Sequence, residues 1–425
     1  MGILNNNSTN YVHSNEPNTL SLHRAMDYNG LGQPILRTSI AGGGAGGTDA
    51  FGRLRVSNPE TLFDTQNRYI DGEQFSTAAS GSGSVTYEPN TSSFSLSVTG
   101  NGDQVVRQAK TVTLYQPGKS MLVLNTFVMD TPQENLRQRV GYFTEQNGIF
   151  LEVDGTNIYI VKRSYITGSV VDERIAQTDW NGEKLDGSNG ISLDVSKAQI
   201  IWTDIEWLGV GSVRVGFVID GAFHLCHTFN HANNISSVYM TTASLNCRYE
   251  ITSTGASANM TQICSTVISE GGYLPTPPLK FTGNGTTETR LVTADTLYPL
   301  VSIRLDPSYP DSVVVPVSLS ILTTSVVYGE VKIIEGATLT NASFSNVVST
   351  VVEEDSAATA ISGGTAVYES LFASRATVEL SSVVSKRLQL AREADGTPIT
   401  LTVAAAATSG NADVLYKFGW AELSN

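Results

Sequence analysis

The chain has 425 residues, of which 40% are hydrophobic, so it can bury sizeable cores and is not wholly disordered. Its 26 Lys and Arg face 40 Asp and Glu, and the net charge of −14 argues against a nucleic-acid backbone as the main partner, because no basic surplus exists to displace counterions. No run of eighteen apolar residues occurs, so we expect no membrane insertion. Only 16% of the residues are charged, and such a charge-poor surface suits sugars or other protein subunits.

Three regions follow one another along the chain. Residues 1–50 are rich in Asn and Gly without sustained apolar periodicity, which predicts an extended N-terminal arm. Residues 51–272 hold most of the aromatic residues and predict a main β-sandwich of the jelly-roll, lectin-like kind. Glycines and prolines over 271–278 predict a linker, and residues 280–425 predict a second, smaller β-sandwich. Because its Val, Ala, Ser and Thr side chains bury little area each, we expect this last region to depend on the first region or on a neighbouring subunit for stability.

The secondary-structure signal is β along most of the chain. Apolar and polar residues alternate over 94–98, 213–219, 301–305 and 313–321, which is the period of half-buried strands. Pro316 lies inside the last of these runs and has no N–H to donate. We therefore expect it at a sheet edge or at a bulge.

Turn signals separate these runs. Asp154-Gly155 and Asp220-Gly221 each lie between apolar segments and predict tight hairpins of type I′, in which both central residues need positive φ. Many short strands with frequent turns predict an all-β fold. The exception is Thr131-Pro132-Gln133-Glu134, whose N-cap, proline at N1 and glutamate at N3 predict one short helix over 132–140.

Asp204 and Glu206 are the strongest candidates for carboxylate catalysis. On a strand they project from the same face, roughly 7 Å apart, which fits the separation in inverting glycosidases. Jelly-roll glycosidases of the laminarinase type carry a third acid two residues earlier, and Trp202 occupies that position. We therefore expect a solvent-facing or intersubunit acidic pair and no catalytic residue. A polysaccharide depolymerase that uses Asp204 and Glu206 is the alternative.

Two groups of metal-ligating residue types occur. Strand alternation puts His224 and Cys226 on one face and His227 on the other, so these side chains cannot converge on one metal, and His231 more simply orders a loop. The loop over 179–189 crowds oxygen ligands that suit Ca²⁺, although its Asp-Gly and Asn-Gly pairs are typical of plain turns. We expect no cofactor, with Ca²⁺ at this loop as the alternative.

Tryptophans supply the candidate sugar platforms. Trp180, Trp202 and Trp207 can stack on pyranose faces, although aromatic residues in strands more often pack in a core. With Asp204 and Glu206 they are the candidate glycan or interface residues.

Several long segments carry a resemblance to a known family. The first is Asp49-Ala50-Phe51-Gly52-Arg53-Leu54-Arg55-Val56-Ser57. The others are Asp204-Ile205-Glu206-Trp207-Leu208-Gly209-Val210-Gly211, Val213-Arg214-Val215-Gly216-Phe217-Val218-Ile219-Asp220-Gly221, His231-Ala232-Asn233 and Arg248-Tyr249-Glu250-Ile251. These motifs resemble virion structural proteins of tailed phages, best represented in marine and cyanobacterial phages. The resemblance spans 49–251, roughly half of the chain, and implies a capsid decoration, a fibre or a tail component.

These observations lead to one main hypothesis. We expect a non-enzymatic structural component of a tailed-phage virion, assembled in the host cytoplasm, that attaches to capsid or tail proteins through its arm and β domains. By analogy with fibres and decoration proteins its preferred state is a homotrimer. The alternative is a receptor-binding fibre or spike that recognises host cell-surface glycan.

Overall fold

The computed structural model describes residues 22–28, 34–40, 48–50, 58–68, 74–272, 277–285, 288–324, 328–373, 375–380 and 388–423. Within these ranges the one helical element is η1 (Gln177–Asp179), a three-residue 3-10 helix, and the other regular elements are strands. The prediction of an all-β fold is therefore confirmed. The same ranges contain no helix that is long and apolar enough to cross a membrane.

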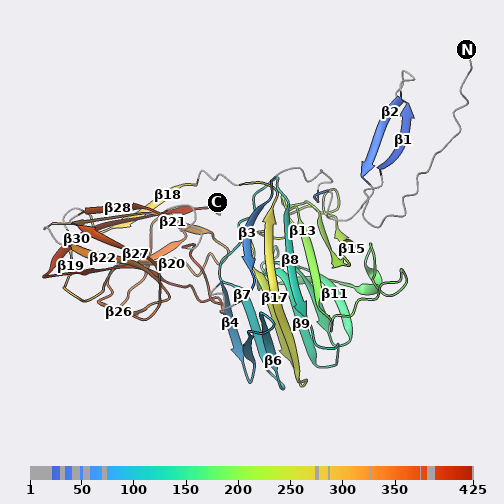
Figure 1. Ribbon diagram of the computed structural model, residues 1–425, viewed down its shortest axis with the longest axis horizontal. Helices are drawn as coiled ribbons and strands as arrows, with labels where there is room; N and C mark the ends of the chain where they lie inside the picture. The colour runs from blue at the N-terminus through green and yellow to red at the C-terminus, as the bar shows by residue number, and fades with distance from the viewer. Residues whose placement is uncertain are drawn as a thin grey trace, which may run out of the picture.

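Two antiparallel sheets form the first unit (Figure 1). In hydrogen-bonded order the seven-stranded sheet contains β12 (Val171–Ala176), β11 (Asn157–Ser164), β10 (Gly148–Asp154), β9 (Leu136–Phe143), β16 (Cys247–Ser253), β7 (Gln104–Ala109) and β4 (Phe75–Ser80). The eight-stranded sheet contains β15 (Ala222–Phe229), β14 (Val213–Ile219), β13 (Gln199–Ile205), β8 (Met121–Val128), β17 (Ala258–Ser269), β6 (Ser93–Val98), β5 (Ser84–Glu88) and, paired with β17, β3 (Glu60–Thr65).

Apolar side chains from one face of each sheet pack into a shared core. The seven-stranded sheet contributes Val140 and Leu151, and the eight-stranded sheet contributes Val123 and Ile201, all of which are buried. Two sheets that share a core in this way make a β-sandwich. The alternating run over 213–219 forms β14, with its apolar positions in this core.

One larger sheet forms the second unit. In hydrogen-bonded order it contains β18 (Leu279–Gly283), β30 (Ala412–Glu422), β21 (Val314–Thr323), β28 (Arg375–Glu379), β27 (Thr365–Ala373), β22 (Tyr328–Glu335), β29 (Leu401–Ala407), β20 (Tyr298–Leu305), β25 (Val352–Asp355) and β24 (Ser345–Asn346). An eleventh strand, β19 (Arg290–Val292), also pairs with β30, and β23 (Thr338–Thr340) pairs with β26 (Ala360–Ser362) as a separate two-stranded sheet.

The two ends of this eleven-stranded sheet meet. The Thr282 hydroxyl in β18 donates to the carboxylate of Glu354 in β25, although the two strands lie near opposite ends of the strand order. The sheet therefore curls around its own core, in which Val301, Val403 and Trp420 are buried. The second unit is therefore built from one curled sheet rather than from two separate sheets that pack face to face.

Pro316 lies at a bulge inside the sheet. The register between β21 and β30 shifts between Pro316 and Ser318, and β28 pairs with β21 only from Ser318 onward. The proline thus lies where β21 has a strand partner on one side, so its missing N–H breaks no ladder. The bulge is confirmed, whereas the edge-strand alternative is wrong for β21 as a whole.

The Asp-Gly hairpins form, but only one has the expected turn. Asp220 and Gly221 have φ values of 52° and 76° and connect β14 to β15, as a type I′ turn requires. In the other hairpin Asp154 pairs with Asn157, so the loop begins at Gly155, whose φ is 59°. That turn is displaced by one residue from the prediction.

The predicted helix over 132–140 is wrong, because Leu136–Phe143 form β9 in the middle of the seven-stranded sheet. Alternate residues Leu136, Val140 and Tyr142 are buried in the sandwich core, and this burial outweighs the local helix-start signal.

A loop from the second unit joins the two units. Residues 388–399, called the joint loop below, contact the end of the seven-stranded sheet. The Gln389 side chain donates to the carbonyl of Val112 at 2.8 Å, and the Arg392 N–H donates to the carbonyl of Lys110 at 3.1 Å. The Ala394 N–H donates to the Ser76 hydroxyl. Residues 280–425 therefore contact the first unit, whereas their expected contact with a neighbouring subunit stays a prediction.

The N-terminal arm contains regular structure in its described part. β1 (Leu22–Tyr28) and β2 (Pro34–Ile40) pair as an antiparallel hairpin, and the extended N-terminal arm as a whole stays a prediction. Farther along, the Thr48 carbonyl accepts a hydrogen bond from Arg214 at 2.7 Å. The other arm residues, most of the motif over 49–57 and residues 273–276 of the linker lie outside the described residues.

Candidate functional site

Asp204 fixes the end of the arm rather than facing solvent. It lies on β13 directly opposite Arg214 on β14, its carboxylate is 0% exposed, and the two side chains are 2.5 Å apart. The same Arg214 guanidinium donates to the Thr48 carbonyl. The pair therefore ties residues 48–50 to the eight-stranded sheet within one chain, and the expectation of a solvent-facing pair is wrong.

Glu206 follows β13 and anchors the next loop. It is also 0% exposed and accepts a hydrogen bond from the Tyr115 hydroxyl at 3.0 Å. That hydroxyl accepts from the backbone N–H groups of Trp207 and Leu208 at 3.1 and 3.3 Å. Burial, together with the negative charge of Glu206, raises the pKa of Tyr115 far above its usual value. A polysaccharide cannot reach either carboxylate, so the depolymerase alternative loses the two residues on which it depended.

The tryptophans belong to the packing of the sandwich. Trp180 and Trp202 are 2% and 0% exposed, and their indole N–H groups each donate to a backbone carbonyl at 3.2 Å. Neither offers a ring face to a sugar, so the sugar-platform hypothesis is wrong for both. Trp207 is half-buried, donates to the carbonyl of Met240 at 3.2 Å and meets the Tyr115 ring edge-on.

The histidines and the oxygen-rich loop have local partners. His224 contacts Glu183 at 2.9 Å, and the Asn181 side chain bonds both backbone groups of Thr228. Among the described residues no three His, Cys, Asp or Glu side chains are placed to hold one metal ion. The Ca²⁺ alternative at the loop over 179–189, which also includes Asn and Ser oxygens, stays a prediction.

His231 orders a loop, as its position suggested. Its Nδ1 donates to the Gly211 carbonyl at 2.6 Å, its Nε2 accepts from the Lys162 ammonium at 3.0 Å, and its ring stacks on Tyr239 at 3.9 Å. Burial, aided by the charge of Lys162, holds the pKa of His231 below its usual value despite the bond to Gly211. The neutral ring is therefore the form that fits.

The outer face of the seven-stranded sheet, which points away from the sandwich core, carries a charge network absent from the sequence-based candidates. Glu250, Arg139 and Glu152 lie side by side on β16, β9 and β10. Arg139 contacts Glu152 at 2.6 Å and Glu250 at 3.2 Å. All three side chains are at least nine-tenths buried, so the row is a rigid floor of paired charges.

Further charged side chains surround this row. Glu250 also pairs with Arg248 at 3.2 Å and Arg137 at 3.7 Å, and Arg174 spans Glu152 at 2.6 Å and Asp154 at 2.7 Å. Burial disfavours the charged form of Glu250, but attraction to its arginine neighbours outweighs this effect and holds its pKa below the usual value. The carboxylate therefore stays ionised at neutral pH.

An open groove lies beside this floor. We call it the outer-face groove; it has a volume of about 430 Å³. Its lining residues are Glu134, Asn135, Leu136, Arg137, Asp154, Gly155, Asn157, Tyr159, Thr252 and Thr254. Arg174 covers the Tyr159 ring at 4.3 Å from the ring centre. The Thr252 hydroxyl and the Arg137 Nε are buried atoms without a hydrogen-bond partner among the described residues.

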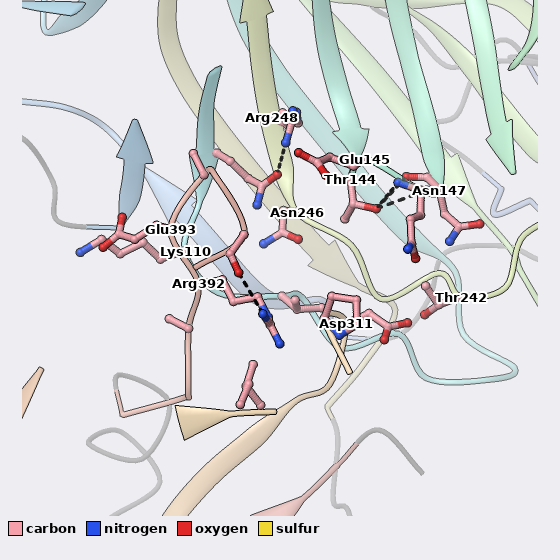
Figure 2. Close-up of a pocket in the computed structure, with 18 of the residues that line it drawn as sticks. Lys110, Thr144, Glu145, Asn147, Thr242, Asn246, Arg248, Asp311, Arg392 and Glu393 are labelled. Atoms are coloured by element: carbon pink, nitrogen blue, oxygen red, sulfur yellow. Dashed lines mark hydrogen bonds between the residues drawn. The ribbon is translucent and has the colours of Figure 1, made fainter. Parts of the chain in front are cut away.

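A second, smaller pocket lies between the two units (Figure 2). Figure 2 shows that its lining comes from both units, with Lys110, Asn246 and Arg248 from the first and Asp311 and Arg392 from the second. Its volume of about 110 Å³ is below the roughly 300–1,000 Å³ of small-molecule sites. Arg392 donates from Nη1 to the Gly396 carbonyl at 2.9 Å and from Nη2 to the Asp306 carbonyl at 2.8 Å. The pocket is best described as part of the joint.

Comparisons with known proteins identify only remote structural likenesses. No protein-family model and no curated protein matches the chain. The carbohydrate recognition domain of Emp47p is 12% identical, with 50% of this chain and 97% of that one covered at a TM-score of 0.32. The CBM2 module of the evolved Dit of Lactobacillus casei BL23 phage J-1 is 7% identical, with 51% and 99% covered at 0.33. A β-1,3-glucanase from Mycobacterium marinum is 11% identical, with 49% and 98% covered at 0.34. These scores say nothing about what this chain binds.

Proposed function

We propose that this protein is a structural component of a tailed-phage virion whose sandwich unit binds host cell-surface glycan in the outer-face groove. The groove carries the glycan part of the proposal, because its volume of about 430 Å³ lies within the usual range for small-molecule sites. The motifs over 49–57 and 204–221 support the virion part through their resemblance to phage structural proteins.

The chemistry of the groove suits a neutral sugar. Sugar hydroxyls both donate and accept hydrogen bonds, so their site needs groups of both kinds. Arg137 and the amide nitrogen of Asn157 supply donors, and Asp154 and the amide oxygen of Asn157 supply acceptors. The exposed part of Tyr159 adds an apolar surface for the sugar ring. Acidic and basic side chains oppose one another around the groove, which disfavours a strongly charged ligand.

Binding without cleavage is the activity that we assign. The groove carboxylate of Asp154 is held in an ion pair with Arg174 at 2.7 Å, so the protein itself already engages it. Incubation of the protein with host polysaccharide should therefore release no oligosaccharide. Release of defined products would overturn the non-enzymatic part.

The groove can be tested with a double variant and a matched control. Asp154→Asn keeps the shape of a groove side chain that is 43% exposed and removes its charge, and Asn157→Ala shortens an exposed side chain. The double variant should fold normally and lose roughly tenfold or more in binding on a glycan array and in adsorption to host cells. Thr86→Val, on the exposed side of β5, is the control and should bind normally.

The outcomes separate the two parts of the proposal. Glycan binding that survives the double variant would remove the groove from the proposal. A wild-type protein that neither binds the array nor adsorbs to host cells would leave only the structural role. Immunogold labelling of purified particles tests that role, and particles without label would contradict it.

A further inference from the structure

Four aromatic rings form a column where the two sheets of the sandwich meet at β15 and β11. The ring centres of His227 and Phe229 are 4.6 Å apart, those of Phe229 and His231 are 6.5 Å apart, and those of His231 and Tyr239 are 3.9 Å apart. We call these four residues the ring column. From β11 the Lys162 ammonium lies 5.2 Å from the centre of the Phe229 ring. The two histidines are 7% and 2% exposed, so both imidazoles lie in the interior.

Both histidines of the column accept a hydrogen bond. His231 donates from Nδ1 to the Gly211 carbonyl and therefore accepts at Nε2 from Lys162, at 3.0 Å. His227 accepts at Nδ1 from the backbone N–H of Asn181 at 3.3 Å. A ring nitrogen accepts only while it carries no proton, so both contacts require neutral imidazoles. Protonation would remove both acceptors and place a positive ring beside the Lys162 ammonium.

Asn181 belongs to a segment that covers the edge of β15. We call residues 180–183 the cover segment. The Gly182 N–H donates to the Cys226 carbonyl at 2.8 Å, and the Asn181 side chain bonds both backbone groups of Thr228 at 2.8 Å. A Cβ on Gly182 would lie 2.9 Å from the Cys226 carbonyl oxygen, so the approach is close. The cover segment thus occupies backbone groups that an edge strand would otherwise expose.

The charges around the column do not compensate a second positive charge. Among the described residues, the charges that act on both histidines are those of Lys162 and of Glu173 on β12. Glu173 attracts an imidazolium, but it is already paired with Lys162 at 2.6 Å and is 51% exposed. Val215 of β14 lies opposite His227 and carries no charge. Burial, the largest effect on both rings, lowers the pKa of His227 and of His231 below the usual value.

We propose that His227 and His231 form a pH-sensitive switch that releases the cover segment and the ring column from β15 in acid, while the rest of the sandwich stays folded. In the open form the rings regain water and protonate near pH 6.5, so the closed form is fully favoured above that pH and loses its advantage below it. Each histidine can raise the open population up to roughly tenfold at pH 5.5. The switch involves neither the outer-face groove nor glycan, so it is independent of the proposed function.

Two native cysteines distinguish local opening from global unfolding. Cys226 on β15 is 0% exposed and reports release of β15, whereas Cys247, 1% exposed on β16 inside the seven-stranded sheet, reports unfolding of the sandwich. The full-length protein is labelled with a thiol-reactive disulfide between about pH 7.5 and 5.5, and each site is quantified by mass spectrometry. Each rate is divided by that of the same cysteine in urea-unfolded protein at the same pH. Labelling of Cys226 should rise roughly tenfold or more, and Cys247 should stay protected.

Substitutions of the histidines assign the effect. The double variant His227→Gln, His231→Gln cannot take up the two protons and should lose the acid rise at Cys226. Each single variant should keep part of the rise, so the test does not depend on the folding of the double variant. His224→Gln is the matched control on the same strand. His224 contacts Glu183 at 2.9 Å, and these side chains are 16% and 40% exposed, so the pair contributes little and this variant should open like wild type.

Three outcomes would overturn the proposal. Labelling of Cys226 that stays constant with pH would show that β15 does not open. Equal acid labelling of Cys226 and Cys247 would show that the sandwich unfolds as a whole. An acid rise of wild-type size in both single variants would show that His227 and His231 are not its cause.

Discussion

Glu250→Gln is the sharpest test of the charge network on the outer face. The substitution keeps the shape of the side chain and removes its negative charge. Glu250 lies within 3.7 Å of Arg137, Arg139 and Arg248, and its side chain is 4% exposed. The amide would leave three guanidinium groups close together with one fewer carboxylate to balance them.

The expected loss follows from the burial of the pairs. Breaking a buried ion pair by neutralising one partner costs about 3–5 kcal/mol, because the other charge stays buried without compensation. We take the lower end, about 3 kcal/mol, since the amide oxygen can still accept one hydrogen bond and Arg137 is partly exposed. For a unit of roughly 200 residues each kcal/mol shifts Tm by about 2–4 °C, so we expect a fall of about 6–12 °C.

Differential scanning calorimetry as a function of pH is the assay. The folded pKa of Glu250 lies below its unfolded value of about 4.3, so its stabilisation is complete above that pH and is lost as the pH falls through the folded pKa. The difference between wild type and Glu250→Gln should therefore shrink in acid. Glu88→Gln, at an exposed position on β5, should melt like wild type throughout.

Two results would refute this reasoning. A fall in Tm below 2 °C at pH 7 would show that the network contributes little, since 2 °C corresponds to about 1 kcal/mol or less for a unit of this size. A large difference that persists unchanged in acid would show that the charge of Glu250 is not its cause.

Three further predictions concern Tyr115, Gly216 and His231 in the sandwich. Tyr115→Phe removes the hydroxyl that bonds Glu206 and two backbone N–H groups and should cost about 1–3 kcal/mol in urea unfolding. Gly216→Ala should destabilise by about 1–3 kcal/mol or more, measured by Tm, because a Cβ there would lie 1.9 Å from the His224 carbonyl oxygen. The folded pKa of His231 is depressed, so stability should be full above about pH 6.5 and fall as the pH drops below it; His231→Gln should flatten the decline between pH 7 and 5.5.

Much of the fold could be predicted because its signals are local. The alternation over 213–219 and the Asp220-Gly221 turn need only neighbouring residues, and both form as expected. The segment over 136–143 was missed for the opposite reason. Its helix-start signal is local, whereas the burial of alternate residues in β9 depends on strands that are distant in sequence.

The candidate site depended on contacts that sequence spacing does not give. Asp204 and Glu206 are both buried, each against a different partner, and these partners, Arg214 and Tyr115, do not follow from the spacing of the two acids. The charge network was missed because its residues alternate like solvent-facing ones. The sequence shows that Arg139 and Glu250 have opposite charges. It does not show that they meet, because they are 111 residues apart and only the strand register brings them together.

The burial of the network on the outer face also determines how the sheet behaves in different salt solutions. Exposed ion pairs weaken as salt screens them, over a Debye length of about 8 Å at physiological ionic strength. The pairs around Arg139 and Glu152 exclude the ions that would screen them, because their side chains are 9% and 1% exposed. The row of paired charges beside the outer-face groove should therefore keep its shape from low to high ionic strength. A neutral ligand held there by hydrogen bonds would be retained with nearly the same affinity across that range.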